Sequence, residues 1–172
     1  MLTTKLDAAT LRSAFSHVPA GVVAVCGRDG ASRIGMAAST FVPVSLDPPL
    51  VAFCVQRTSE TWKRLEMLPR LGISVLAEDQ GSIARRLAAK VDDRFADVET
   101  HDSSTGTLFV AGSTVRFEVT IAEQIPAGDH LIVLFAVDAL DVGAHSGPAH
   151  IDGAETEPII FHKSMFRSIG AA

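Results

Sequence analysis

Residues 35–61 read GMAASTFVPVSLDPPLVAFCVQRTSET, and the rest of the chain is organised around them. The stretch holds two apolar, strand-like runs, at residues 42–44 and 50–55, separated by a rigid corner that contains two prolines. Small and hydroxylated residues flank these runs at 37–40 and 58–61. Small side chains let a ligand approach the backbone, while hydroxyl groups and free amides offer it hydrogen bonds. We therefore expect this stretch to be a cradle for a cofactor.

The composition is that of an ordinary globular protein, with 172 residues, of which 47% are apolar and 20% charged. We expect a single domain over residues 1–172. The net charge of −5 argues against nucleic-acid binding. The longest apolar runs, such as 131–137, are too short to cross a membrane, and the N-terminus lacks an apolar signal core, so we expect a cytoplasmic protein. Cys26 and Cys54 lie in apolar runs without metal spacing and read as buried apolar residues.

The pattern of apolar residues predicts a chain rich in strands that are joined mostly by hairpins. Helices are expected at 7–17, at 59–68 and from residue 78, and long polar loops at 91–107 and 143–157. Such a pattern favours an antiparallel barrel with helices outside it over a parallel sheet. The expected strands cover residues 21–26, 32–38, 42–44, 50–55, 72–76, 113–125, 130–140 and 158–162.

Several common chemistries have no support in the sequence. The chain lacks GxGxxG after a strand, a GxxxxGK[ST] loop and a GxSxG elbow. His145, His150 and Asp152 have no recognised metal spacing, so we expect no metal site. No pair of carboxylates and no Ser/His/Asp arrangement is recognisable. A cofactor that carries the reaction itself is therefore the better interpretation.

Four segments resemble the flavin reductase-like family of split-barrel flavoproteins. They are VPAGVVAV at 18–25, GMAASTF and VSLDPPLV at 35–51, DRFA at 93–96, and AGDH at 127–130. Ala37 stands where the family commonly has threonine. The resemblance implies a mainly β (α+β) fold, namely a six-stranded antiparallel Greek-key split barrel with flanking short helices. It also implies a homodimer with the flavin near the interface.

The resemblance further implies an NAD(P)H:flavin oxidoreductase. It would transfer a hydride from NADH or NADPH to FMN or FAD and supply the reduced flavin to a separate monooxygenase. His130 is the expected catalytic-site residue, on the nicotinamide side, although a histidine after a Gly-Asp turn is by itself more often structural. The expected cofactor-binding residues are Met36, Ala37, Ala38, Ser39, Thr40, Ser45, Asp47, Pro48, Cys54, Val55, Gln56, Arg57, Ser59, Thr61, Arg94 and Phe95.

These residues divide into groups with different expected tasks. Ala37, Ala38 and Ser39 are small enough for an isoalloxazine ring to lie against their strand. Residues 59–61 open a helix, whose free amides suit the flavin phosphate, although plain helix capping explains them equally well. Arg94 is a candidate for a phosphate or nicotinamide contact, and Phe95 either covers the ring or anchors its loop.

Other interpretations stay open from the sequence alone. The first is a split barrel that binds or stores flavin without reductase activity. The second is a haem-binding split barrel, for which no histidine spacing argues. The third is an enzyme similar to pyridoxamine-phosphate oxidases, against which the SLDPP corner and the lack of a basic cluster weigh.

Overall fold

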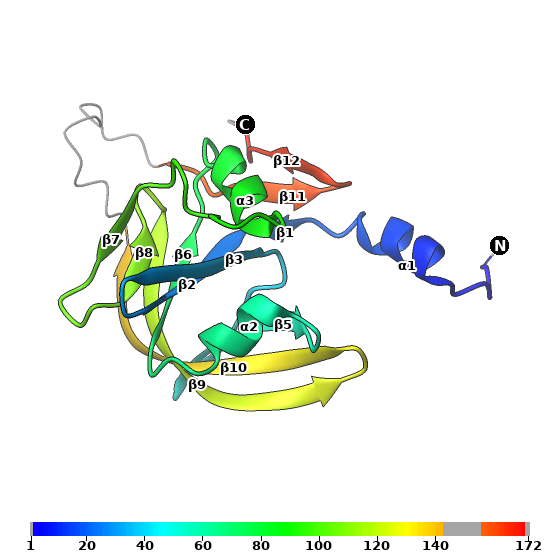
Figure 1. The fold of residues 1–172 in the computed structure, drawn as a ribbon. Coiled ribbons are helices and arrows are strands. Elements are labelled where there is room, and N and C mark those ends of the chain that lie inside the picture. Colours follow the sequence, from blue (N-terminus) through cyan, green and yellow to red (C-terminus); the bar gives the residue numbers. More distant parts are fainter. Residues whose placement is uncertain (1, 143–155, 171–172) are drawn as a thin grey trace.

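The computed structural model describes residues 2–142 and 156–170, which form a mainly β structure with three short helices (Figure 1). Its largest unit is an antiparallel sheet of seven strands. In spatial order these strands are β3 (Ser32–Ala38), β2 (Val23–Asp29), β6 (Leu71–Val75), β9 (Val115–Ala127), β10 (His130–Val142), β5 (Pro49–Gln56) and β4 (Val42–Leu46).

Two smaller sheets and the helices complete the described part of the chain. One sheet joins β1 (Ala20–Gly21), β11 (Ile160–His162) and β12 (Met165–Arg167), and the other pairs β7 (Thr100–Asp102) with β8 (Leu108–Val110). The helices are α1 (Ala8–Phe15), α2 (Glu60–Leu65) and α3 (Gly81–Ala88). None of them is long and apolar enough to span a membrane.

The structure confirms the large antiparallel sheet and most expected strands, and it corrects the sequence interpretation in three places. The expected strand at 21–26 is divided at Val22, whose amide bonds to Ile159 instead of to a neighbour in the main sheet. The expected loop at 91–107 contains β7, and the tail at 164–167 is the strand β12. The expected loop at 143–157 lies outside the described residues up to position 155.

Strand β2 separates two apolar cores. Val23 and Val25 point into the core of the main sheet, while Ala24 and Cys26 point into a second core beneath α3. The strand is therefore buried on both faces, as its continuous apolar run predicts. Burial raises the pKa of the Cys26 thiol to about 12, so this cysteine acts as a small apolar residue, as expected.

Helix α2 is anchored to the interior of the main sheet by one tryptophan. The Trp62 side chain is only 2% exposed and packs edge-on against Phe53 and Phe135, with centroid distances of 5.2 and 6.2 Å. Its indole N–H donates to Gln124 over 3.0 Å. The Ser59 hydroxyl caps the helix by accepting a hydrogen bond from the Trp62 amide. These contacts fix where the first turn of α2 lies.

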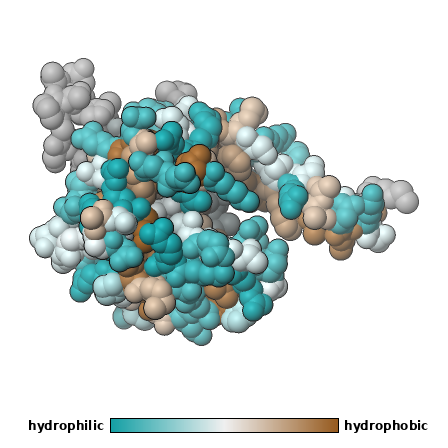
Figure 2. All heavy atoms as spheres, viewed as in Figure 1, coloured by the Kyte–Doolittle hydropathy of each residue, from teal (hydrophilic) through white to brown (hydrophobic). Residues whose placement is uncertain are grey.

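Helix α1 differs from the other two helices because none of its residues is buried against the described part of the chain. It leaves the body of the molecule as an arm (Figure 1). The space-filling view shows apolar residues, in brown, along this arm (Figure 2). Phe15 is 67% exposed and Leu6 is 66% exposed.

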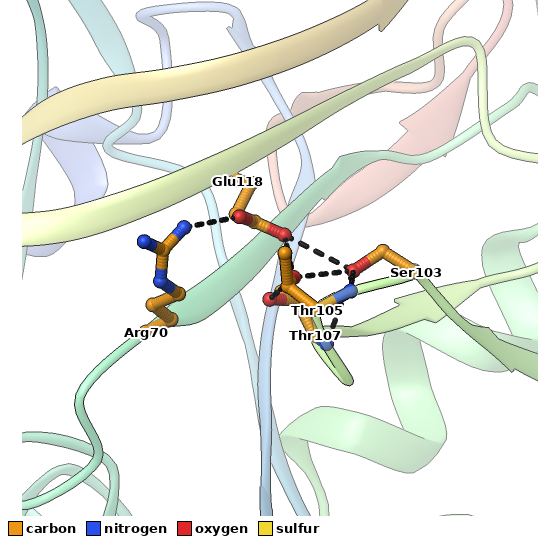
Figure 3. Close-up of polar contacts among 5 residues, drawn as sticks. All are labelled: Arg70, Ser103, Thr105, Thr107 and Glu118. Atoms are coloured by element: carbon orange, nitrogen blue, oxygen red, sulfur yellow. Dashed lines mark hydrogen bonds and ion pairs between the residues drawn. The ribbon is translucent and has the colours of Figure 1, made fainter.

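A buried carboxylate ties the loop before β8 to the main sheet (Figure 3). The Glu118 side chain, on β9, is 7% exposed. Its Oε1 accepts from Arg70 at 2.5 Å, and its Oε2 accepts from Ser103 at 3.0 Å and from Thr105 at 2.5 Å. Burial alone would raise the pKa of Glu118, but hydrogen bonds from Thr105, Thr107, Arg70 and Ser103 outweigh it and lower the pKa to about 2.

Replacing Glu118 by glutamine should lower the free energy of unfolding at neutral pH by about 2 kcal/mol, because the charge-assisted bonds are lost. The folded-state pKa of about 2 lies below the ordinary 4.5, so this stabilisation is complete above pH 4.5 and is lost as pH falls toward 2. Urea unfolding across that range should therefore show the variant and the wild type converging at low pH. Glu123→Gln, an exposed change on the same strand, is the matched control and should have little effect.

Candidate functional site

A cavity of about 240 Å³ lies where β3, β5 and β10 meet the start of α2. Its lining comes from four separate parts of the chain. All of the lining residues are among those that the sequence singled out. They are residues 36–40, residues 54–56, Ser59 and His130.

The backbone of β3 provides one wall of this cavity. In the strand order of the described residues, β3 is terminal, so only one of its backbone edges is paired, with β2. Ala37, Ala38 and Ser39 are half-buried and have short side chains that leave this wall open. A planar ligand can therefore lie against the strand, and its polar edge can bond to main-chain groups.

A threonine hydroxyl joins the end of this wall to β5. Thr40 Oγ1 accepts from the Cys54 amide at 2.9 Å and donates to the Cys54 carbonyl at 3.0 Å. The hydroxyl thus replaces a strand partner for both main-chain groups of Cys54. The expected role of Thr40 as a ligand contact is combined here with a structural role.

The start of α2 borders the cavity at Ser59. Arg94 reaches this turn from the loop after α3, and its Nη1 donates to Thr61 Oγ1 at 2.9 Å and to the Gly35 carbonyl at 3.1 Å. One guanidinium therefore connects the first turn of α2 to β3. Lys63 pairs with Glu60 at 2.6 Å, on the exposed side of the helix.

His130 begins β10 opposite Gln56 and faces the same cavity as residues 36–40. Its Nδ1 lies 2.7 Å from Asp129 Oδ1. This hydrogen bond, followed by the charge of His130, lowers the pKa of the exposed Asp129 carboxyl. The Asp129 carboxylate therefore orients the imidazole ring, with Nε2 as the other ring nitrogen.

Several expected residues are not brought into the cavity. Residues 45–48 form the end of β4 and the turn into β5, at the opposite end of β5 from Cys54. Thr61 and Arg94 bond to each other beside the cavity, and Arg57 is exposed next to it. The peptide bond between Asp47 and Pro48 is cis, within this turn.

Phe95 is 3% exposed and packs beneath β3, so its observed position is that of a loop anchor. A Cβ atom placed on Gly35 would lie 2.6 Å from the Phe95 ring. Arg33 adds a cation–π contact, with its guanidinium carbon 5.1 Å from the ring centroid. Of the two expected tasks for Phe95, the geometry of this chain matches anchoring.

The sequence analysis missed a set of apolar residues next to the small-residue wall. A second hollow of about 120 Å³ also touches residues 37–39, and Val22, α3 and the β11–β12 hairpin form the rest of its lining. The missed residues are Val22, Ala84, Ala88, Phe161 and Phe166. The signal available in the sequence was the pair of aromatic residues Phe161 and Phe166 on either side of residues 162–165, which is typical of a hairpin. The turn between them uses Lys163 and Ser164 at positive φ, without the glycine or asparagine that marks such turns.

A cavity of similar size, about 250 Å³, lies around the far half of β10 and includes Leu140 and Asp141. Its charged groups already have partners, since Arg116 contacts both His101 and Asp141, and Glu118 is held by Arg70 from outside the cavity. Volume does not distinguish the two cavities. The wall of unpaired backbone beside small residues singles out the cavity at β3 as the candidate site.

No cluster of three or more potential metal ligands occurs among the residues that the structure describes. His145, His150 and Asp152, which were weighed as ligands, lie outside those residues.

Comparison with known proteins identifies the family. The family model described as "Flavin reductase like domain" matches residues 15–170, so the chain belongs to the flavin reductase-like family. It is 38% identical to the actinorhodin polyketide dimerase of Streptomyces coelicolor over 83% of this chain and 81% of that protein. It is 27% identical to HsaB, the reductase subunit of a flavin-dependent monooxygenase of Mycobacterium tuberculosis, over 98% of this chain and 86% of that one.

A solved structure gives the same result. The NADH:FAD oxidoreductase SgcE6 of Streptomyces globisporus, in complex with NAD and FAD fragments, superimposes with a TM-score of 0.85 at 32% identity. The match covers 99% of this chain and 97% of that one.

The double hydrogen bond of Thr40 provides a test of how this site is held together. Thr40→Val keeps the side-chain shape but removes the hydroxyl, so the free energy of unfolding should fall by about 1 kcal/mol. Urea denaturation followed by Trp62 fluorescence measures this change. Thr58→Val, at an exposed position between Cys54 and α2, is the control. Equal stability of the two variants would show that the hydrogen bonds between Thr40 and Cys54 do not stabilise the fold.

Proposed function

We propose that this chain is an NAD(P)H-dependent flavin reductase that transfers a hydride to FMN or FAD and supplies the reduced flavin to a separate monooxygenase. The observation that carries this proposal is the cavity at β3. Every residue of its lining is among those that the family resemblance singled out, in a chain whose relatives include HsaB and SgcE6. The single domain is proposed to span residues 1–172.

The site residues are assigned tasks that fit their positions. The flavin ring is proposed to lie against residues 36–40, where the unpaired edge of β3 can bond its polar edge. Main-chain N–H groups aimed at that edge would stabilise the negative charge of the reduced ring. Cys54, Val55 and Gln56 would form the wall across from it.

The phosphate is proposed to bind at the first turn of α2, near Ser59 and Thr61. Free amides and the helix dipole favour an anion there, and the nearby Arg57 adds positive charge. Arg94 would act by holding Thr61 in place through its 2.9 Å hydrogen bond.

His130 is proposed to act on the nicotinamide side of the cavity. A bound flavin would supply the redox chemistry as the hydride acceptor. The protein then has to align the two rings. His130, oriented by Asp129, would position the nicotinamide through its exposed face.

Two proposals concern the architecture. The first six strands of the main sheet, from β3 to β5, are proposed to close as a Greek-key split barrel through the bonds between Thr40 and Cys54, with β4 as an added strand. The chain is proposed to form a homodimer. In support, the cavity of one chain is smaller than the roughly 300–1,000 Å³ of typical ligand pockets, which suggests a missing wall.

A second candidate function follows from the 38% identity to a polyketide dimerase. In that case the same cavity would serve a reaction that joins two polyketide molecules. The two candidates can be distinguished with flavin and nicotinamide nucleotide alone. A reductase oxidises the nicotinamide in that mixture, because it needs no further substrate.

Mixing the purified protein with NADH or NADPH and either FMN or FAD tests the main proposal. We expect loss of nicotinamide absorbance that depends on added flavin. Flavin binding without nicotinamide oxidation would instead identify a binding or storage protein, and a Soret band on purification would identify a haem protein.

Ser39→Trp should weaken flavin binding at least 10-fold, because the indole would fill the space beside the β3 wall. Fluorescence quenching of FMN or FAD on titration with protein measures the affinity. Ser32→Trp, at the exposed opposite end of β3, should bind flavin as the wild type does. If both variants keep full affinity, the ring does not lie at residues 36–40.

His130→Ala should raise the KM for the nicotinamide nucleotide several-fold more than the KM for flavin. Asp129→Asn keeps the imidazole but weakens its orientation, so it should have a smaller effect in the same direction. Steady-state kinetics with each substrate varied in turn provide the measurement. A larger effect on flavin would move His130 to the flavin side.

A further inference from the structure

The cavity around the far half of β10, which we call the far cavity, is separate from the candidate site, since the two share no lining residue. Its volume is about 250 Å³. One water molecule takes up about 30 Å³ of liquid, whereas a cavity of about 150 Å³ is enough to hold benzene. The far cavity therefore has room for a small organic molecule. Within the described residues, its lining is formed by His101, Ser103, Phe109, Arg116, Glu118, Ala139, Leu140 and Asp141.

The floor of the far cavity comes from the pairing of β9 with β10. Arg116 and Glu118 are two residues apart on β9, so their side chains lie on the same face of the sheet. Across the strand pair, Arg116 lies opposite Asp141, and Glu118 lies opposite Ala139. The side chain of Ala139 is a single methyl group. It leaves space next to the Glu118 carboxylate that a larger residue would fill.

Two stacked rings form a wall of the far cavity. The His101 ring lies on the Phe109 ring with a centroid distance of 5.7 Å and an interplanar angle of 28°. Phe109 is only 5% exposed, whereas His101 is half-buried, so the stack is fixed at the phenyl end. Leu140 adds apolar surface to the lining. Aromatic rings favour offset-stacked and edge-to-face contacts, so this wall suits a ligand that contains an aromatic ring.

The charged groups at the far cavity balance one another. Arg116 pairs with Asp141, and Arg70 donates to Glu118 from outside the cavity (Figure 3). Burial, followed by the charge of Arg116, lowers the pKa of His101, so the imidazole adds no charge at neutral pH. No cation is left over to bind an anion, and burying an unpaired charge is costly. The lining therefore favours a neutral ligand.

The lining also has one donor and one acceptor to spare. A guanidinium can only donate, so the bond from Arg116 to His101 Nε2 places the imidazole proton on Nδ1. Asp141 uses Oδ2 for Arg116, which leaves Oδ1 as an acceptor. Neither His101 Nδ1 nor Asp141 Oδ1 forms a hydrogen bond with the described part of the chain. A hydroxyl group, which both accepts and donates, is compatible with this pair.

We propose that the far cavity binds a small neutral phenol, whose ring lies against the His101–Phe109 wall and whose hydroxyl oxygen accepts from His101 Nδ1. The wall accounts for the ring, the balanced charges account for neutrality, and the spare imidazole proton accounts for the hydroxyl. The volume allows one or two fused rings. This site goes beyond the proposed function and does not depend on it.

Three compounds of similar size test the chemical class. 2-Naphthol has the ring and the hydroxyl, 2-naphthoate carries a negative charge, and decahydro-2-naphthol keeps the hydroxyl without an aromatic ring. Isothermal titration calorimetry of the whole chain at neutral pH measures the binding of each. We expect 2-naphthol to bind with a Kd below about 1 mM. It should bind roughly 10-fold more tightly than either of the other compounds.

Two variants test the location. Ala139→Trp fills the floor and should weaken 2-naphthol binding by roughly 10-fold, whereas Asp138→Trp, at the neighbouring exposed position outside the lining, should not. His101→Phe keeps a stacked ring but removes the N–H group, so it should weaken binding about 5-fold. His17→Phe, at an exposed position after α1, is its control. Thermal unfolding shows that each variant is folded, and His101→Phe decides the question if Ala139→Trp is not.

Ser39→Trp, which blocks the cavity at β3, separates the far cavity from the candidate site. It should bind 2-naphthol as the wild type does. If Ser39→Trp loses binding while Ala139→Trp keeps it, the phenol lies in the cavity at β3 and the proposal fails. It also fails if 2-naphthol does not bind, if the three compounds bind equally well, or if folded Ala139→Trp and His101→Phe both bind as the wild type does.

Discussion

The edge-on packing of Trp62 against Phe53 and Phe135 is the contact on which the candidate site depends. Helix α2 has six residues and would not persist without it. Because the indole is held inside the main sheet, the first turn of α2 has a defined place beside β3 and β5. Arg94 then joins that turn to the Gly35 carbonyl, so the two walls of the cavity are fixed relative to each other. The site is thus positioned by a buried aromatic cluster and one guanidinium.

Strand β10 links this region to the rest of the molecule. It pairs with β5 and β9 and runs from His130 at the candidate site to Val142 near the second cavity. The inward side of the strand fills the core, and its outward side remains apolar. Half-exposed apolar residues on the outward side of a strand are typical of a surface that takes part in assembly, which fits the homodimer proposed for this chain.

The sequence predicted the large antiparallel sheet and part of the cavity lining because both have strong local signals. Strand β9 alternates clearly, and residues 36–40 combine small size with hydroxyl groups. Residues 54–56 and His130 were expected from the family resemblance. The role of Phe95 depends on contacts with Gly35, which are distant in sequence and leave no local pattern. Strand β12 was missed because the turn before it uses Lys163 and Ser164 at positive φ. The SLDPP corner is close in sequence to residues 54–56 and was therefore expected near the cavity. In the structure the corner lies at the start of the eight-residue strand β5, whereas residues 54–56 lie at its other end.

The unpaired edge of β3 has a consequence for how proteins of this type diverge. A ligand bound by main-chain groups needs no particular side chain at the positions that touch it; it needs only that those side chains stay small. Selection at residues 37–39 would then act on volume and not on chemical type, so alanine, serine and threonine could replace one another over evolutionary time. By this argument, Ala37 keeps the wall open as serine or threonine would. Sequence variation at this wall is therefore a poor guide to changed ligand preference, and a bulky replacement there would mark a chain that has lost the site.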